Sequence, residues 1–188
     1  MRLFAAIPMP EPARRALLNV LATLEGTGWR VRWVGEGNLH LTIKFYGEVA
    51  EPLVAQVSAR LTDAVRRTPV LPLRLDGVDA FPGLRRPRVI WAAVDGPPAL
   101  ELMQHRVERE AAAVGFPSDG KPFRPHITLG RVKSGAALPG TAPALLNQIE
   151  LDLAFEAVQV VLFESRLTRA GAEHTAKLTL DLAGGRAA

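Results

Sequence analysis

The alternation of apolar and polar residues along the chain predicts short strands interleaved with amphipathic helices. Apolar residues spaced three or four positions apart predict helices over 11–25, 51–67 and 98–114. Alternating or short apolar runs predict strands at 2–7, 31–34, 38–45, 70–75, 88–94, 125–132, 149–155, 158–163 and 174–182. Residues 168–171 join the last two strands as a hairpin. Because several strands are consecutive, we expect an α+β fold with antiparallel or mixed sheets rather than a doubly wound parallel sheet.

One short pattern occurs twice in the chain. HLTI occupies 40–43 and HITL occupies 126–129, 86 residues further on. Each copy falls in an expected strand, and each half of the chain also contains an expected helix. The simplest interpretation is a single domain over 1–188 with two similar halves, each of which contributes one His-x-Thr-x motif.

The repeated motif has a chemical logic when it is placed on a strand. Side chains alternate across a strand, so histidine and threonine share one face while the two apolar residues anchor the other face in the core. If the halves are related by an approximate two-fold, the two polar pairs meet across a groove. One imidazole can then act as base and the other as acid near neutral pH, while the hydroxyls donate to oxygens of an anion. Phosphorus chemistry fits this set best.

Composition removes several other classes of site. The chain has no cysteine, which excludes disulfides, thiolate metal sites and a cysteine nucleophile. A catalytic zinc needs three protein ligands, and the remaining histidines, His105 on a helix face and His174 at a hairpin edge, are expected on the solvated surface. We therefore expect no metal and no cofactor. The sequence also lacks the Gly-x-x-x-x-Gly-Lys-Ser/Thr loop that an ATP-consuming ligase would carry.

Charge and the amino terminus bear on partners and location. The net charge of +4 comes mainly from arginine, which suits phosphate recognition, although a biased codon usage explains the arginines equally well. The apolar run at 2–7 is broken by Pro8, Pro10 and Pro12, and it is too short for a signal peptide or a membrane helix. We expect a cytoplasmic monomer with no membrane segment.

At these motifs the chain resembles the 2H phosphoesterase superfamily, specifically the RNA 2',3'-cyclic phosphodiesterases also called 2'-5' RNA ligases, the LigT-like family. The matching segments are RLFAAI at 2–7, NLHLTIKFYGE at 38–48, RVIW at 88–91, PFRPHITLGR at 122–131 and FESRL at 163–167. FYG at 45–47 departs from the commoner FLG. The resemblance implies two pseudo-symmetric lobes of mostly antiparallel sheet, with flanking helices, around a central cleft.

The resemblance also implies an activity and its residues. Members open RNA 2',3'-cyclic phosphates to 2'-phosphates without a metal, and some catalyse a reversible 2'-5' ligation that needs no ATP. The implied partner is RNA with a cyclic phosphate end, or a cyclic nucleotide. The positions that match the family's motif are His40, Thr42, His126 and Thr128, and Arg131 matches the arginine that often follows the second motif.

The cations near the motifs need separate treatment. Strict alternation from His126 puts Arg131 on the core face, unless Gly130 introduces a bulge or strand end that re-aims it toward phosphate. Lys44 is expected on the face of His40, where it is either a rival phosphate-binding cation or a solvated strand residue. The basic residues just before the second motif, Lys121 and Arg124, either line the RNA path or keep a loop solvated.

Aromatic residues near the motifs are candidate stacking surfaces for a base. Phe45, Tyr46 and Phe123 are the candidates, because aromatic rings stack on unpaired bases. Phe45 alternates with Leu41 and is expected in the core, as is Trp91.

These observations combine into one hypothesis and one alternative. We expect hydrolysis of a ribose 2',3'-cyclic phosphate, with His126 as base, His40 as acid, and the two threonines holding oxygens with Arg131 or Lys44. The two motifs are equivalent in sequence, so they do not decide which histidine is which. The alternative is a non-catalytic RNA- or nucleotide-binding module that uses the same cleft, disfavoured because only 6% of residues are aromatic.

Overall fold

The computed structural model describes residues 1–84, 86–118, 120–168 and 171–183 as an α+β fold. The helices are α1 (Glu11–Glu25), α2 (Glu51–Val65), α3 (Pro98–Ala112) and α4 (Ala142–Asn147), with the short 3-10 helix η1 (Glu36–Asn38). The strands are β1 (Arg2–Pro8), β2 (Val31–Trp33), β3 (His40–Glu48), β4 (Leu71–Phe81), β5 (Val89–Asp95), β6 (His126–Val132), β7 (Asp152–Ala157), β8 (Gln159–Thr168) and β9 (Gly171–Asp181).

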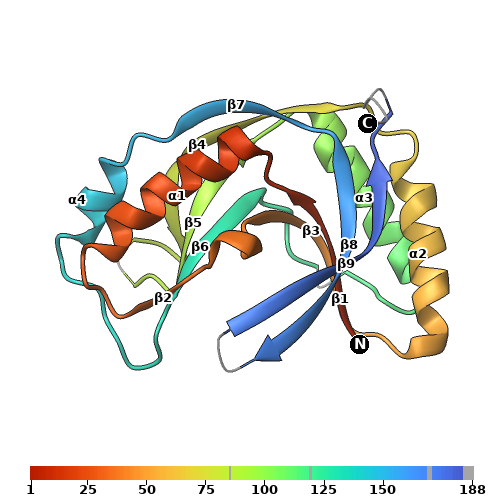
Figure 1. Cartoon of the computed structure of the whole chain (residues 1–188), viewed down its shortest axis with the longest axis horizontal. Helices are drawn as coiled ribbons and strands as arrows, with labels where there is room; N and C mark the ends of the chain where they lie inside the picture. Colours follow the sequence, from red (N-terminus) through yellow and green to blue (C-terminus); the bar gives the residue numbers. More distant parts are fainter. Residues whose placement is uncertain (85, 119, 169–170, 184–188) are drawn as a thin grey trace.

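All nine strands belong to one curved sheet, in the order β7-β4-β5-β6-β3-β1-β8-β9, with β2 paired to β6 beside this path. Every pairing between these strands is antiparallel. Helices α1 and α4 cover the half of the sheet that contains β4 and β7, while α2 and α3 cover the half with β1, β8 and β9 (Figure 1). The predicted α+β class with antiparallel strands and flanking helices is confirmed.

Along this path the sheet has four strands on each side of the junction between β3 and β6, with β2 additional beside β6, and the element order repeats across the junction. The run β1, α1, β3 in one half matches β5, α3, β6 in the other, and α1 and α3 are both 15 residues long. Strand β4, which follows β3 and α2 in the chain, pairs with β5 of the other half. In the same way, β8 pairs with β1 of the first half. That the halves arose as two copies of one unit stays a prediction.

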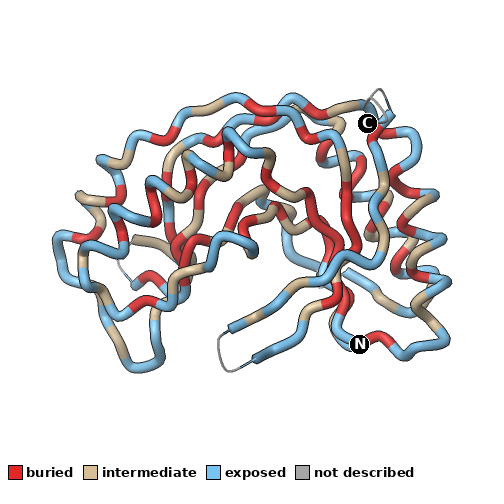
Figure 2. Tube along the Cα trace, in the orientation of Figure 1, coloured by how far each residue is buried: buried red, intermediate tan, exposed pale blue. Residues whose placement is uncertain are grey.

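The helices form where the apolar periodicity predicts them and bury that face. Each of the three long helices has proline in its first turn, where the missing N–H costs no helical hydrogen bond. The inward face of α1 is buried at Ala13, Leu17, Val20, Leu21 and Leu24, and Figure 2 shows buried positions concentrated between the helices and the sheet.

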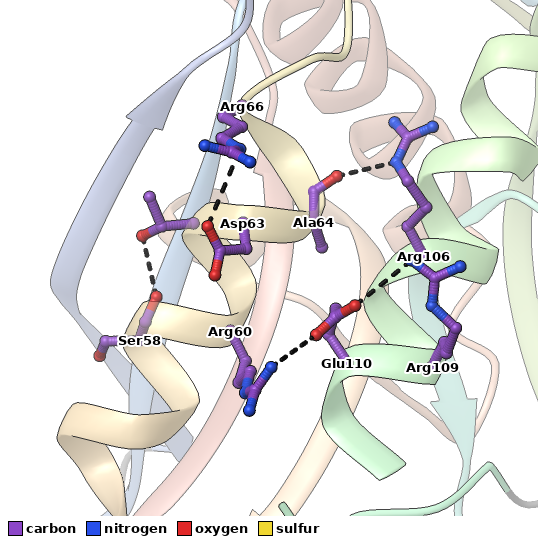
Figure 3. Close-up of polar contacts among 9 residues, drawn as sticks. Ser58, Arg60, Asp63, Ala64, Arg66, Arg106, Arg109 and Glu110 are labelled. Carbon is purple, nitrogen blue, oxygen red and sulfur yellow. Dashed lines mark hydrogen bonds and ion pairs between the residues drawn. The ribbon is translucent and has the colours of Figure 1, made fainter. Parts of the chain in front are cut away.

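Helices α2 and α3 are also joined by arginines along their contact (Figure 3). The Arg106 Nε donates to the Ala64 carbonyl at 2.9 Å, and Arg60 Nη1 lies 3.2 Å from Glu110 Oε2. These contacts hold α3 in place behind β3, the strand that carries the first motif.

Four elements differ clearly from the sequence-based expectation. Strand β4 continues to Phe81 instead of ending at residue 75, because a bulge at Asp76 and Gly77 (φ 76°) carries the strand through an apparent turn. Helix α4 was not expected, since six residues give too little periodicity to detect. Strands β8 and β9 are longer than expected.

The hairpin between β8 and β9 is present, with Thr168 paired to Gly171. The predicted turn residues Arg169 and Ala170 lie outside the described residues. Among the described helices, none has the length and apolar character needed to cross a bilayer.

Candidate active site

The two motifs meet at the centre of the sheet. Strands β3 and β6 pair there through Leu41 and Ile127, both fully buried. Because the strands are antiparallel, His40 and Thr128 fall on one side of this pair, and Thr42 and His126 fall on the other. Each histidine thus lies next to the threonine of the other motif. The apolar motif residues are anchored in the core, as their alternation predicts.

Each histidine rests against two stacked aromatic rings. The His40 ring centroid lies 4.8 Å from that of Phe4, which stacks on Phe163 at 5.3 Å. Around His126 the same arrangement is made by other residues: Phe81 and Trp91 stack at 4.7 Å and lie 5.4 and 5.6 Å from the imidazole. Trp91 is therefore half-buried beside His126 rather than in the core, where it was expected. The rings restrict how each imidazole can turn.

Hydrogen bonding fixes the tautomer of His126. Its Nδ1 lies 2.7 Å from the Arg124 carbonyl oxygen. A carbonyl only accepts, so Nδ1 carries a hydrogen and donates it. In the neutral ring Nε2 is then the nitrogen with a free lone pair, which suits a proton acceptor.

The environment of His40 disfavours its charged form. Burial, then the nearby His174 and least of all His126, lowers the pKa of His40 to about 4, although a backbone hydrogen bond with Asn38 partly opposes them. At neutral pH the imidazole of His40 is consequently uncharged in the free protein.

His174 is a cleft residue that the sequence did not reveal. It was expected on the surface, but β9 places its ring centroid 5.3 Å from that of His40 and 4.8 Å from that of Phe4. Burial lowers the pKa of His174 as well. Nothing in its neighbourhood repeats the motif, so only the folding of the hairpin reveals its position. His105 is exposed on α3, as expected.

A bulge in β3 changes which residues face the cleft after the first motif. Thr42 pairs with Ala6 and Lys44 with Ala5, which leaves Ile43 as the extra residue. Lys44 consequently points away from His40: it is 5% exposed, and its Nζ lies 2.5 Å from Glu108 Oε2 on α3. The predicted placement of Lys44 on the face of His40 is wrong, because this ammonium ties β3 to α3. The side chain instead lines a cavity that contains Thr42 and His126, and its binding of phosphate stays a prediction.

The bulge also exchanges the faces of the next two residues, so that Phe45 is exposed and Tyr46 is buried. Phe45 is 50% exposed and faces the cleft, with the Arg2 guanidinium 4.9 Å from its ring centroid. Tyr46 is buried against Phe116 at 5.7 Å, and burial raises the pKa of its hydroxyl. The core assignment of Phe45 and the proposed base stacking on Tyr46 are both wrong.

A matching bulge in β6 brings Arg131 into the cleft. Trp91 pairs with Thr128 and Ile90 with Gly130, so Leu129 is the extra residue. The bulge expected near Gly130 is confirmed, and Arg131 shares a cavity with His40 and Thr128. The position that holds Phe45 in β3 thus holds an arginine in β6.

Two cavities flank the motifs and share Thr42 and Phe45. One, of about 640 Å³, is lined by His40, Thr128, His174, Arg2, Arg32 and Arg131, and no carboxylate is found among its described lining residues. We call it the arginine cavity. The other, of about 840 Å³, is lined by His126, Phe81, Phe123, Lys121 and Arg124. A third cavity, of about 570 Å³, lies between α1, α4 and β7 and contains no motif residue.

The chemistry available in the cleft is proton transfer and anion binding. No group of three or more histidine or carboxylate side chains that could hold a metal ion occurs within the described residues. The predicted residues Arg124, Lys121 and Phe123 lie on the His126 side, and Arg131 lies on the His40 side. The arginine cavity also contains Arg2 and Arg32, which sequence reasoning did not single out.

Comparison with known proteins adds a family. The sequence profile of the 2'-5' RNA ligase superfamily matches residues 10–168. An RNA 2',3'-cyclic phosphodiesterase of Aeropyrum pernix is 35% identical over 157 residues, which cover 82% of this chain and 88% of that protein. A crystal structure of a Thermus thermophilus protein matches with a TM-score of 0.84 and 28% identity, over 99% of this chain and 100% of that one. Escherichia coli LigT complexed with 3'-AMP matches with a TM-score of 0.77 and 27% identity, over 97% and 98%.

Proposed function

Because this chain belongs to the 2'-5' RNA ligase superfamily, we propose that it opens the 2',3'-cyclic phosphate at the end of an RNA to a 2'-phosphate. Like its curated relatives, it is a hydrolase of the RNA 2',3'-cyclic phosphodiesterase type. The observation that carries the mechanism is the meeting of the two His-x-Thr motifs on either side of the Leu41–Ile127 pair.

The reaction is a single displacement at phosphorus. A water oxygen bonds to phosphorus as the bond from phosphorus to the 3' oxygen breaks. His126 accepts the proton of the water at Nε2, since its Nδ1–H is held by the Arg124 carbonyl. His40 gives its proton to the departing 3' oxygen. The hydroxyls of Thr42 and Thr128 donate to the non-bridging oxygens as negative charge builds on them, and the Arg131 guanidinium compensates that charge.

To act as the acid, His40 must take up a proton when the substrate binds. In the free protein burial keeps this imidazole neutral. A phosphate anion placed beside it favours the imidazolium and raises its pKa, so substrate binding loads the acid. An imidazolium that is poorly stabilised by its surroundings is also a strong acid, which suits transfer to an alkoxide leaving group.

The proposed mechanism also allows ligation without ATP. If a 5'-hydroxyl of a second RNA takes the place of water, its oxygen bonds to phosphorus while the 3' oxygen leaves, and the product is a 2'-5' phosphodiester. The same two histidines would transfer the two protons.

The alternative function, a module that binds RNA or nucleotides without turnover, predicts that the cyclic phosphate persists.

The test uses a dinucleotide with a 2',3'-cyclic phosphate end and follows the product by phosphorus NMR. We expect a 2'-phosphate, and each of H40A and H126A should lower kcat/KM by about 10²–10⁴-fold. The double variant should lose little more than either single one, since groups that act in one event are non-additive. The exposed His105 supplies the control, and H105A should retain full activity.

Three outcomes would count against the proposal. Binding without conversion would favour the binding module. A 3'-phosphate product would mean that the ribose lies the other way round and that acid and base are exchanged. A single variant with nearly full activity would remove that histidine from the mechanism.

A further inference from the structure

Two arginines lie directly opposite each other in the arginine cavity. Arg32 on β2 pairs in register with Arg131 on β6, and both side chains are exposed and line this cavity. Cross-strand partners have Cβ atoms about 5 Å apart, and like charges in this position destabilise a sheet. Neither guanidinium has an ion-pair partner within the described part of the chain. A pair of arginines that repel each other in a cavity without carboxylates is suited to bind anions.

The fold holds Arg32 in this place through Gly130. Strand β2 has three residues and pairs only with β6. A Cβ on Gly130 would come within 2.6 Å of both Trp33 Cε3 and Val31 Cγ1. The glycine therefore lets the two residues that flank Arg32 pack across β6, and this packing fixes the strand from which Arg32 extends.

Arg32 has no role in the proposed reaction. The proposed reaction assigns Arg131 and the hydroxyls to the reacting phosphate. With His40 as the acid for the 3' oxygen, the terminal ribose lies in the arginine cavity. The next phosphate, attached to the 5' oxygen of that ribose, is then one sugar away from the reacting one, and Arg32 lines the same cavity.

We propose that Arg32 binds the phosphate attached to the 5' oxygen of the terminal ribose and thereby makes the enzyme selective for that phosphate. This inference rests on the proposed function. The guanidinium can form two parallel hydrogen bonds with such a group. The phosphate can be an internal phosphodiester of an RNA chain or a 5'-monophosphate, since both present at least two non-bridging oxygens.

The experiment compares kcat/KM for three substrates: a cyclic mononucleotide with a free 5'-hydroxyl, the same nucleotide with a 5'-phosphate, and a dinucleotide with a cyclic phosphate end. The wild type should prefer at least one of the two that carry the extra phosphate. R32Q should lose about tenfold or more on that substrate, and change by less than about twofold on the 5'-hydroxyl nucleotide. Arg30 is exposed two residues earlier and does not line the cavity, so R30Q controls for the loss of one positive charge.

A neutral linkage separates a direct contact from a structural effect. Replacing the internal phosphodiester by a methylphosphonate removes its charge, which should cost the wild type about as much as R32Q loses and should cost R32Q little more. Equal losses of R32Q on all three substrates would overturn the proposal, as would a wild type indifferent to the extra phosphate. R32K and thermal melts of each variant check that β2 remains in place.

Binding decides the inference even without turnover. The Kd of a 2'-phosphorylated dinucleotide and that of a 2'-mononucleotide can be measured for wild type and R32Q. If no substrate is hydrolysed, the proposed reaction fails. The inference still stands if only the dinucleotide loses affinity in R32Q, and it fails if both ligands lose it equally.

Discussion

His40 is neutral in the free cleft for the same reason that it is well positioned. The aromatic rings of Phe4 and Phe163 and the neighbouring His174 restrict its imidazole and remove it from water. The restriction favours a defined geometry of the imidazole. The removal from water disfavours the positive charge that His40 must carry to act as an acid. A substrate that brings its own negative charge reconciles the two requirements.

This account predicts how the pKa of His40 responds to ligand. Proton NMR of the imidazole Cε1–H should give a pKa of about 4 in the free protein. Saturating 2'-nucleotide should raise it, because the phosphate stabilises the imidazolium. H174Q should also raise the free-protein value, because it removes one of the two histidines that lower it. A His40 resonance that titrates at the same pH with and without nucleotide would argue against its role as acid.

The buried, neutral His40 also makes stability depend on pH. Between the ordinary histidine pKa of 6.5 and the folded value of about 4, the unfolded chain binds a proton at this residue that the folded chain does not. The free energy of unfolding should therefore be highest above pH 6.5 and fall as the pH is lowered to 4, by at most about 3 kcal/mol from this group. Urea titrations at several pH values measure the fall, and H40Q should lack this share of it. Equal pH dependence in both proteins would contradict the assignment.

At the level of single residues, the sequence identifies the motif histidines and threonines because their pattern occurs twice with the same apolar neighbours. It identifies neither His174 nor Arg32: Arg32 pairs with a residue of the distant strand β6, and His174 reaches the cleft because its neighbour β8 pairs with the distant strand β1. No local pattern distinguishes these two from other exposed polar residues on strands. The arrangement of the sheet has to be known first.

Among the elements, the strands carry most of the errors of side-chain placement. Simple alternation fails after Thr42 and after Thr128, because each motif strand contains a bulge that shifts the pattern by one residue. In β6 the sequence indicates the bulge, because Gly130 is a residue type that is common at bulges. In β3 the corresponding position holds Lys44, which gives no such signal, so the residues after it were assigned to the wrong faces.

The close approach of β2 and β6 predicts the effect of a single methyl group. In G130A the added Cβ would meet Trp33 and Val31 at 2.6 Å, so β2 must shift or detach. We expect a loss of about 1–3 kcal/mol in the free energy of unfolding. We also expect a lower kcat/KM, because Arg32 and Arg131 move apart.

Gly140 provides the matched control, since a Cβ there meets nothing within 4 Å. G140A should leave both the melting temperature and kcat/KM unchanged. If G130A melts and reacts like the wild type, the close packing of β2 on β6 does not position the arginines.

For the whole molecule, the sequence predicts the class of fold but not the partners of its strands. Hydrophobic periodicity locates most helices and strands, since it depends on local burial. It does not indicate that β4 joins the sheet beside β5, or that β8 joins beside β1. Through these exchanges each half of the chain completes the sheet of the other half. The cytoplasmic location and monomeric state expected from the sequence stay predictions.

The narrow junction between β3 and β6 has a mechanical consequence. Their register holds one residue pair, Leu41 with Ile127, and beyond it β6 turns its edge to β2. If the two lobes rotate about this junction, it acts as a fulcrum, and each atom moves in proportion to its distance from it. Both histidines lie beside this pivot, whereas Thr168 and Gly171 line the arginine cavity from β8 and β9, and Asn38 Nδ2 of η1 donates to the Ala172 carbonyl at 2.8 Å. Such a rotation changes the width of the arginine cavity more than the span between the two histidines, because both histidines lie next to the Leu41–Ile127 pair.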